Sequence, residues 1–240
     1  MSWAGAERLD VYVGESIAGL RRAAGQGSFE DTWAAWGADT SSLAAALGDM
    51  VGQGARLRRP RVRAWLSGAL ARPFLFKPPN GLRLEEAPEV AAAMAPGLTG
   101  LRQPCLAWVG EANADGSCVA IAMERETRDQ LEGSARAARM RLASLRPWWA
   151  AVFDDRAAEQ GTMALVDTDS TTLVAWTALG VESAATFVPS PDERGLEAII
   201  KRRSIEAQSG IGIEVVRLDT QGGVRELSAS GTAPPFMNRQ

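Results

Sequence analysis

A strand–turn–strand pattern occurs twice in this chain, and each copy opens one half of the sequence. The first copy spans residues 9–20, where apolar residues alternate with others before a short Gly-Glu-Ser turn. The second copy spans residues 164–176, where the turn reads Asp-Thr-Asp-Ser. Alternation with a period of two around a small polar turn indicates a β-hairpin. The repeat suggests a fold built from two similar halves.

The elements after the two hairpins also correspond. After the first hairpin, the sequence predicts a strand or loop at residues 29–36, a helix at 40–50 that ends at Gly52 and Gly54, and a strand from residue 61. After the second hairpin, it predicts a strand at 184–188, a helix at 193–207 and a strand at 211–218. Both halves therefore have the order β-β-β-α-β. The predicted fold class is α/β with mixed sheets and two such subdomains.

Further elements lie between the two halves. Residues 78–103 are interrupted by prolines and glycines around a short alanine-rich helix at 86–95, and strands at 105–109 and 118–123 flank a turn. An apolar stripe of Leu131, Ala135, Ala138 and Leu142 predicts a helix over residues 125–143. Residues 146–153 are expected to form a strand, in which the neighbouring Trp148 and Trp149 point to opposite faces.

These patterns predict three regions. Residues 1–160 form the first subdomain, with an inserted accessory segment at about 78–123. Residues 161–222 form the second subdomain, which is expected to be incomplete because the chain ends soon after its last strand. Residues 223–240 contain few core-forming side chains and are expected to be a flexible tail.

Composition excludes several classes of chemistry. The chain has no histidine, which removes Ser-His-Asp and Cys-His hydrolases and histidine-ligated zinc. Its two cysteines, Cys105 and Cys118, do not have the spacing of a metal site; a disulfide is open, but two thiols in neighbouring buried strands are favoured. A net charge of -3 gives no reason to expect nucleic acid as a partner.

The sequence shows no targeting or spanning segment. The N-terminus lacks a basic region followed by an apolar run, and no stretch approaches the ~20 apolar residues that cross a bilayer. The expected location is therefore cytoplasmic.

The duplicated β-β-β-α-β order resembles the ribonuclease-H-like core of the actin-like ATPase superfamily. Within it, the chain is most similar to the PilM-like proteins and the cytoplasmic domains of GspL-like proteins, which belong to type IV pilus and type II secretion platforms. The resemblance is carried by residues 9–20, 61–76, 146–149 and 165–176. It implies an actin-like fold, a phosphate-binding hairpin in each half, and ATP with Mg²⁺ as the cofactor of active members.

The first hairpin departs from the pattern of active members. These carry Asp-X-Gly followed by Ser or Thr, in which the carboxylate positions Mg²⁺-bound water and the glycine lets backbone amides approach phosphate. This chain keeps Gly14, with Glu15 and Ser16 after it, but Tyr12 replaces the aspartate. Asp10 lies two residues earlier, about 6–7 Å back along the strand.

The second hairpin departs at its glycine. Active members have Asp-X-Gly, whereas this chain keeps the carboxylate as Asp167 and has Asp169 at the glycine position, followed by Ser170 and Thr171. An added negative charge beside a triphosphate opposes binding unless Mg²⁺ intervenes. Both tips are thus candidate nucleotide-phosphate hairpins that have lost part of the motif, and the expectation is that no cofactor is held.

The favoured function is that of a non-catalytic actin-like scaffold on a pilus or secretion platform, peripheral to the inner membrane. The resemblance implies the cytoplasmic tail of an inner-membrane protein as the partner, bound as an extended peptide, and an assembly ATPase as a second partner.

Three alternatives remain open. An active ATPase or phosphotransferase of the same fold would use Asp10, Glu15 and Asp167 around Mg²⁺. A nuclease would recruit Asp10, Glu124 and Asp167. Finally, both tips would be ordinary turns in which Asp, Ser and Thr side chains cap the local backbone.

Overall fold

The computed structural model describes residues 8–25, 28–37, 40–51, 59–154, 160–206, 213–220, 223–226 and 237–239. The chain divides into two compact units. The first contains residues 1–67, 128–155 and 219–237, and the second contains residues 68–127, 156–218 and 238–240. The chain thus crosses from one unit to the other between Ser67 and Gly68.

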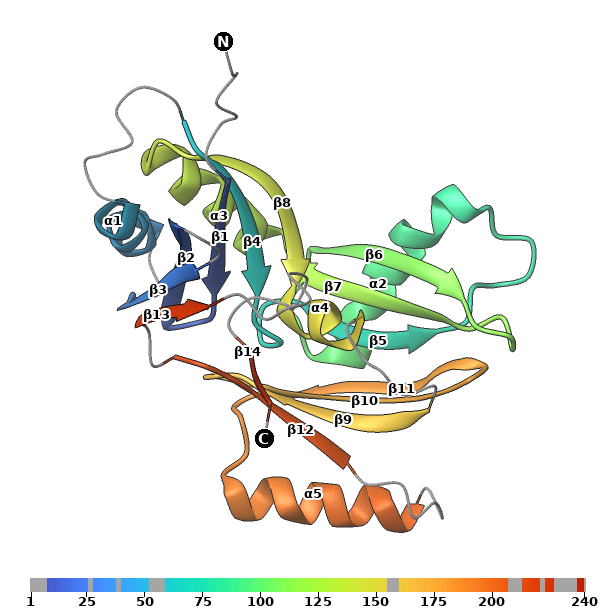
Figure 1. Ribbon diagram of the computed structural model, residues 1–240. Helices are drawn as coiled ribbons and strands as arrows, with labels where there is room; N and C mark the ends of the chain where they lie inside the picture. The colour runs from blue at the N-terminus through green and yellow to red at the C-terminus, as the bar shows by residue number, and fades with distance from the viewer. Residues whose placement is uncertain are drawn as a thin grey trace. The chain divides into compact units, whose positions relative to one another are not determined.

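The first unit is built on a six-stranded mixed sheet, in the order β13-β3-β2-β1-β4-β8 (Figure 1). Its strands are β1 Arg8–Val13, β2 Ile17–Gly25, β3 Ser28–Ala35, β4 Arg61–Leu66, β8 Arg141–Pro147 and β13 Gly223–Glu226. The first three strands form an antiparallel meander, while β4 runs parallel to β1 and β8 runs parallel to β4. The predicted hairpin and the strand from residue 61 are confirmed, and the segment at 29–36, predicted as a strand or a loop, forms β3.

The two faces of this sheet have different chemistry. Leu9, Val11 and Val13 alternate along β1 and are buried on one face, as period-two alternation requires. Helix α1, Thr40–Val51, packs against β2 and β3 and buries Leu43 and Leu47. The other face carries polar and aromatic side chains.

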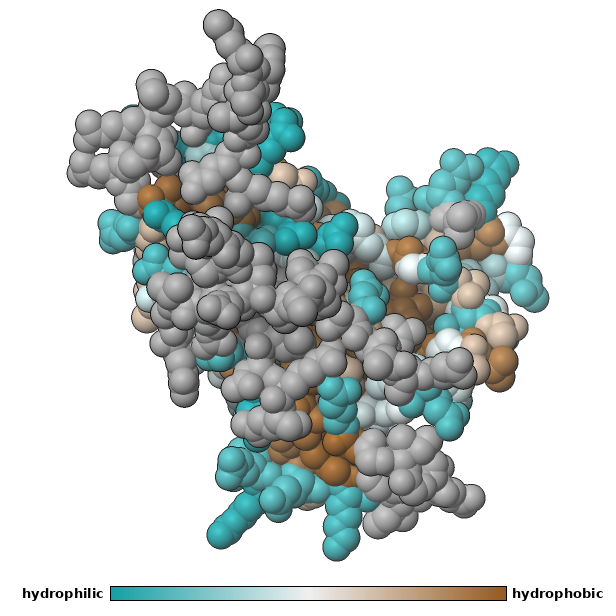
Figure 2. All heavy atoms as spheres, in the orientation of Figure 1, coloured by the Kyte–Doolittle hydropathy of each residue, from teal (hydrophilic) through white to brown (hydrophobic). Residues whose placement is uncertain are grey.

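The second unit contains a five-stranded sheet in the order β11-β10-β9-β12-β14. Its strands are β9 Gly161–Val166, β10 Thr171–Thr177, β11 Gly180–Phe187, β12 Ile213–Leu218 and β14 Met237–Arg239. Helix α5, Glu193–Glu206, lies along one face of this sheet (Figure 1), and its Leu196 packs with Ala164 and Leu173. The outer side of α5 is hydrophilic, and apolar atoms show between the helix and the sheet (Figure 2).

The second unit also contains a three-stranded antiparallel sheet, in the order β5-β7-β6. Its strands are β5 Arg72–Phe76, β6 Cys105–Ala112 and β7 Cys118–Glu124. Helix α2, Ala87–Thr99, follows a short 3-10 turn at Leu84–Glu86 and packs on one face of the sheet. Small side chains, among them Ala91, Ala95, Ala120 and Ala122, let helix and sheet approach closely.

The duplicated topology is confirmed. Both β1-β2-β3-α1-β4 and β9-β10-β11-α5-β12 place the fourth strand parallel to the first. The sheets also match in order, since β14 stands beside β12 as β8 stands beside β4. The second sheet thus has a fifth strand, which comes from the range that was expected to be a flexible tail. Strand β13, in the same range, pairs with β3.

The division into units differs from the predicted one. The accessory segment was expected to belong with residues 1–160, but it falls in the unit that contains residues 161–218. Its turn forms hydrogen bonds with β11, and β5 contacts β11. Residues 128–155 return to the first unit because β8 pairs with β4.

Two predictions of secondary structure were wrong after residue 137. Helix α3, Arg125–Ala137, ends six residues earlier than predicted, because Arg139 adopts a left-handed conformation with φ of 56° and the Met140 amide turns back to the Ala135 carbonyl. The residues after it form β8, whose pairing with β4 prevails over the helical periodicity. The expected strand at 146–153 is mostly helix α4, Trp148–Asp154, in which both tryptophans are buried.

The two cysteines lie in neighbouring strands, as expected, and both are free and buried. Cys105 stands opposite Glu124 and Cys118 stands opposite Ala112, so the register places them about 20 Å apart along the hairpin. Within the described ranges, no helix has both the length and the apolar composition needed to cross a membrane.

Candidate functional site

The first candidate hairpin tip closes β1 onto β2. The Gly14 amide donates to the Ile17 carbonyl at 2.9 Å, and the Ser16 carbonyl accepts from the Trp36 amide at 2.9 Å. Gly14 is buried, whereas Glu15 and Ser16 are exposed. The tip is thus a tight turn tied to the end of β3, with two polar residues directed outward.

Tyr12, which stands where active members have an aspartate, is a core residue. It is fully buried, and its ring lies 5.7 Å from the ring of Trp33 and 6.4 Å from that of Trp148, which it meets edge-on at 89°. Gly19, beside Tyr12 on β2, leaves room for the Trp33 ring, since a Cβ there would lie 2.6 Å from it. The position that serves a metal in active members is here part of an aromatic cluster.

Asp10 is held by β4. The Arg63 guanidinium binds it in a bidentate manner, with Nε to Oδ1 at 2.5 Å and Nη2 to Oδ2 at 2.8 Å, and Trp65 Nε1 donates to Oδ1 at 3.1 Å. Arg63 also lies over the Trp65 ring, 4.6 Å from its centroid. Both carboxylate oxygens therefore have donors, and the geometry fits a structural role better than a ligand of Mg²⁺.

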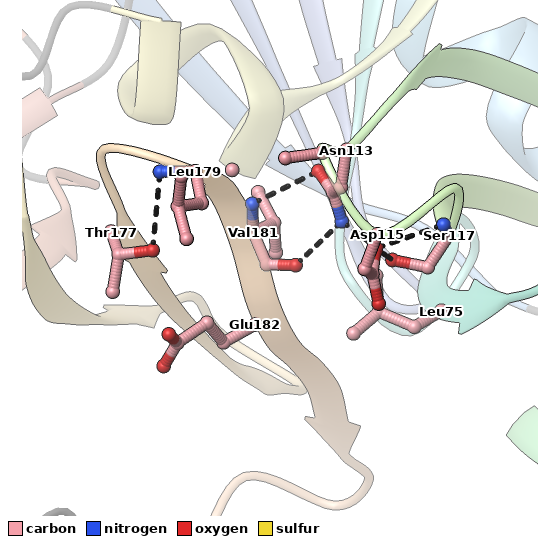
Figure 3. Close-up of a pocket in the computed structure, with 10 residues that line it drawn as sticks. Leu75, Asn113, Asp115, Ser117, Thr177, Leu179, Val181 and Glu182 are labelled. Atoms are coloured by element: carbon pink, nitrogen blue, oxygen red, sulfur yellow. Dashed lines mark hydrogen bonds between the residues drawn. The ribbon is translucent and has the colours of Figure 1, made fainter.

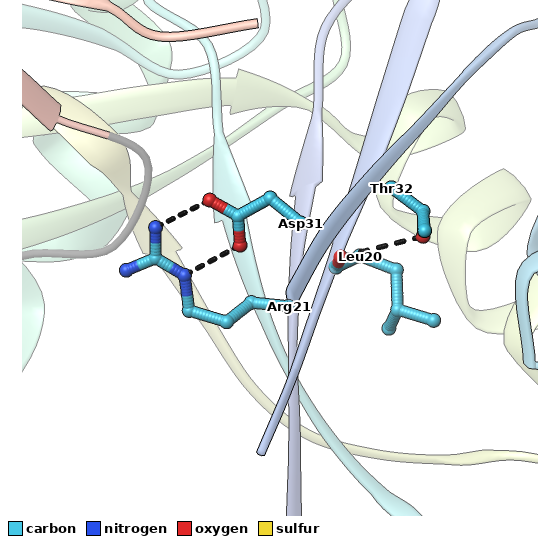
Figure 4. A network of polar contacts seen from close by, with 4 residues as sticks. All are labelled: Leu20, Arg21, Asp31 and Thr32. Atoms are coloured by element: carbon cyan, nitrogen blue, oxygen red, sulfur yellow. Dashed lines mark hydrogen bonds and ion pairs between the residues drawn. The ribbon is translucent and has the colours of Figure 1, made fainter. Parts of the chain in front are cut away.

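Asp10 belongs to a row of alternating charges across four strands. Strand register places Asp31, Arg21, Asp10 and Arg63 side by side on β3, β2, β1 and β4. Arg21 binds Asp31 through Nε at 2.7 Å and Nη2 at 2.5 Å (Figure 4), while Thr32 and Leu20 lie on the other face of the same strands. The row has no net charge, and Asp31 is almost completely buried.

The second candidate tip is organised by Asp167. Its Oδ1 accepts from the Ser170 amide at 2.7 Å and the Asp169 amide at 3.2 Å, and the Ser170 hydroxyl lies within 2.9 Å of both carboxylate oxygens. Its Oδ2 accepts from the Gly68 amide at 2.9 Å. Asp167 is the side chain that caps this turn and also ties it to the segment after β4.

The environment of Asp167 perturbs its protonation. Burial raises the pKa of this carboxyl from its ordinary value of 3.8 to about 7, and the negative charge of Asp169 acts in the same direction. The hydrogen bonds from Gly68 and Ser170 oppose the change because they stabilise the ionised form. Desolvation outweighs these hydrogen bonds, so the Asp167 carboxyl is only partly ionised near neutral pH.

Gly68 was not identified as a site residue from the sequence. A Cβ at this position would lie 2.4 Å from Thr172 Oγ1 and 2.7 Å from Ser170 Oγ, so only glycine lets the backbone reach the Asp167 carboxylate. The available signal was the Ser-Gly pair that directly follows the strand at 61–66. A glycine just after a buried strand often marks a close approach of two backbones.

The structure places the candidate residues in two groups. Gly14, Glu15 and Ser16 lie in the first unit, whereas Asp167, Asp169, Ser170 and Thr171 lie together at one tip in the second. The Asp169 carbonyl accepts from the Ser190 amide at 3.0 Å, and the Thr171 and Ser190 hydroxyls are 2.8 Å apart. The second group is therefore a closed network of local hydrogen bonds.

The residues of this network are a poor fit for a nucleotide with Mg²⁺. Both oxygens of Asp167 already accept hydrogen bonds, the Asp169 amide is one of their donors, and the Asp169 side chain adds negative charge. Among the described residues, no group of three or more Asp, Glu or Cys side chains could hold a metal ion. Glu124, which a nuclease would recruit, accepts a hydrogen bond from the Arg102 amide at 2.8 Å.

A cavity lies elsewhere in the second unit, where the β6–β7 turn meets the β10–β11 turn (Figure 3). Its volume is about 360 Å³, and Leu75, Leu179 and Val181 form its apolar walls. Two carboxylates, Asp115 and Glu182, also line it. No pattern in the sequence pointed to this cavity, because its two turns are more than sixty residues apart in the chain.

Comparisons with known proteins find similarity only at the level of structure. No family model matches the chain, and no curated protein sequence does. The cytoplasmic domain of EpsL, an inner membrane component of the type II secretion system of Vibrio cholerae, superimposes with a TM-score of 0.53 at 14% identity, over 88% of this chain and 82% of that one.

Two further solved structures are similar. The PilM–PilN type IV pilus biogenesis complex gives a TM-score of 0.57 at 16% identity, over 82% of this chain and 66% of that one. A Bacteroides thetaiotaomicron protein with an actin-like ATPase fold and unknown function gives 0.52 at 12% identity, over 89% of this chain and 82% of that one. Together with the duplicated topology, these likenesses show that the chain has the actin-like ATPase fold.

Proposed function

We propose that this protein is an actin-like scaffold on the cytoplasmic side of a bacterial type IV pilus or type II secretion platform. In this role it docks the cytoplasmic tail of an inner-membrane protein and does not turn over nucleotide. The two similar structures from such systems support the assignment of the platform, since one is an inner membrane component of a type II secretion system and the other a PilM–PilN pilus complex.

The observation that carries the non-catalytic part is the hydrogen bonding of Asp167. In a phosphate hairpin this carboxylate must be available to a metal-bound water. Here it accepts bonds from the Gly68 and Ser170 amides and from the Ser170 hydroxyl. Placing a metal there would break bonds that hold the hairpin together.

Tyr12 supports the same conclusion from the first hairpin. Restoring an aspartate at this position would bury a carboxylate between Trp33 and Trp148, in surroundings that disfavour charge. The two hairpins therefore differ from working phosphate loops for separate physical reasons. A single substitution would not restore the site.

The first test is nucleotide binding by calorimetry with ATP and Mg²⁺, together with measurement of phosphate release. We expect neither binding nor turnover above the level of a buffer control. An Asp167→Ala variant serves as the comparison. Turnover that this substitution abolishes would support the alternative, an active ATPase or phosphotransferase, and would contradict the proposal.

The second test concerns the partner. Synthetic peptides with the sequences of the cytoplasmic tails of single-span pilus and secretion proteins from the same organism would be titrated against the full chain. We expect one tail to bind saturably, and a scrambled peptide of the same composition not to bind. Binding of none of the tails, or equal binding of the scrambled peptide, would contradict the docking role.

A further inference from the structure

The cavity between the β6–β7 and β10–β11 turns has rigid walls. The side-chain amide of Asn113 pairs with the backbone of Val181 in both directions, donating to its carbonyl at 2.9 Å and accepting from its amide at 3.2 Å (Figure 3). The Ala114 amide also donates to the Leu179 carbonyl at 3.2 Å. These hydrogen bonds join the two turns, so the cavity is already formed without a ligand. A preformed cavity lowers the entropic cost of binding.

The cavity combines apolar walls with negative charge. Leu179 is 72% exposed at its rim, which is unusual for a leucine, and Leu75 and Val181 continue the apolar surface inward. Asp115 and Glu182 come from different elements, the β6–β7 turn and β11. The ten lining residues include no basic side chain.

The two carboxylates differ in how they are held. Asp115 accepts from the Ser117 amide at 2.9 Å and from its hydroxyl at 2.6 Å, and these bonds hold the pKa of Asp115 below its ordinary value. The Glu182 carboxylate points away from Asn113 (Figure 3), and among the described residues no Lys or Arg forms an ion pair with it. Nearby Lys77 also contributes to the lowered pKa of Asp115. Glu182 is therefore the carboxylate better suited to a cation supplied by a ligand, and Asp115 adds further negative charge to the cavity.

The apolar surface continues beyond the cavity. Leu75 stands opposite Val119, and in the next row Ile121 stands opposite Trp108; Pro73, on the other side of Ile121, is buried. These side chains face away from α2, which packs on the opposite face against Phe74, Ala120 and their neighbours. Trp108 is 44% exposed, and Val119 and Ile121 are partly exposed, so an apolar side chain of a partner can reach this face.

We propose that this cavity is a docking site for an extended segment of a protein partner, in which a lysine or arginine stands next to an apolar residue. The aliphatic stem of the basic side chain would lie along Leu75 and Leu179, and its charged head would meet Glu182 or Asp115. The neighbouring apolar residue would cover the surface toward Trp108. This site is separate from both hairpin tips. Its proposed role does not depend on the protein being part of a pilus or secretion platform.

The test uses short fluorescent peptides that carry leucines on either side of a central arginine. Matched peptides place lysine, citrulline or glutamate at the centre, and N-acetyl-arginine amide is the small-molecule arm. We expect fluorescence anisotropy with the full chain to show saturable binding of the arginine and lysine peptides. The citrulline peptide should bind roughly tenfold more weakly, because it lacks the charge, and added salt should weaken the charged peptides.

Variants locate the site. Glu182→Gln and Asp115→Asn each keep the shape of the side chain, and the double variant should lower the affinity for the arginine peptide by roughly tenfold. Leu179→Ser should weaken all the peptides, including the citrulline one. Glu197→Gln, which removes an exposed carboxylate from α5 in the same unit, is the matched control and should change nothing.

Several results would overturn the proposal. These are equal binding of the arginine and glutamate peptides, no saturable binding of any peptide, or unchanged affinity in the double variant. N-acetyl-arginine amide that binds as tightly as the arginine peptide would identify the site as one for a small cation instead of a protein segment. The scaffold role is tested with ATP and with the tail peptides of membrane proteins. The docking site and the scaffold role can therefore be contradicted independently of each other.

Discussion

The carboxylate of Asp167 accepts a hydrogen bond from the backbone amide of Gly68 at 2.9 Å, although the two residues are 99 positions apart in the chain. Gly68 is the first residue of the second unit, and Asp167 is the first residue after β9. One side chain therefore caps the β9–β10 turn and also fixes the segment that enters the unit. Like the contacts of Asp10 with Arg63 and of Asn113 with Val181, it joins segments that are distant in the chain.

The raised pKa of Asp167 predicts how stability depends on pH. Because the folded protein binds this proton more tightly than the unfolded chain, the contribution of Asp167 is fully present below pH 3.8 and is lost as the pH rises to about 7. Lowering the pH from about 8 to about 5 should therefore raise the thermal midpoint of the wild type relative to that of Asp167→Asn. The difference between the two curves removes the contributions of all other groups, and parallel curves would contradict the prediction.

The contact with Gly68 should not tolerate a side chain. In Gly68→Ala the new methyl group would displace the Ser170 and Thr172 hydroxyls, which are hydrogen-bonded to Asp167 and Thr186. We expect a loss of about 1–3 kcal/mol in the free energy of unfolding, measured by urea titration. Gly97→Ala in α2 is the control: nothing lies within 4 Å of its Cβ position, and it should be neutral or slightly stabilising.

The row of alternating charges formed by Asp31, Arg21, Asp10 and Arg63 should stabilise the first sheet cooperatively. Among the described residues, Arg63→Ala would leave Asp10 with its bond from Trp65 alone, in a position where its side chain is 20% exposed, and we expect a loss of about 1–3 kcal/mol. A double-mutant cycle with Asp10→Asn would measure the coupling between the two residues. Arg128→Ala, which removes the exposed pair with Glu132 on α3, should cost less than about 0.5 kcal/mol. Equal losses at both sites would show that the row has no special role.

The joint between Asn113 and Val181 should control local opening of the second unit. Asn113→Ala removes two hydrogen bonds to β11, so amide hydrogen exchange at Val181 and its neighbours should become faster. Gly180→Ala should act in the same way, because Gly180 has φ of 126° and its Cβ would lie 2.1 Å from Asn113 Oδ1. Exchange in the first unit, for example along β1, is the internal control and should not change. Uniform acceleration in both units would mean global destabilisation instead.

The duplicated core could be predicted from local patterns in the sequence. Alternating residues around Gly14 and Asp167 predicted both hairpins, and the elements after them were recognisable because strands and helices that pack on one face carry a regular apolar period. The resemblance to the actin-like ATPases marked Tyr12 and Asp169 as departures from that family's phosphate-binding motif. Such inferences succeed because they depend on residues close together in the chain.

Contacts between residues far apart in the chain could not be predicted in this way, because they depend on how the strands pair. The periodicity of residues 138–142 favoured helix, but pairing of β8 with β4 placed them in a sheet, and the two tryptophans after Pro147 became buried in a short helix. The same holds for three other contacts. Gly68 reaches Asp167, Arg63 reaches Asp10, and the β6–β7 turn meets the β10–β11 turn, although no spacing in the sequence relates these segments. The hairpin tips and the local caps within them, such as Ser170 on Asp167, were therefore predictable from the sequence. The Gly68 amide on Asp167 and the Arg63 guanidinium on Asp10 were not, because only the fold brings these distant donors to the two carboxylates.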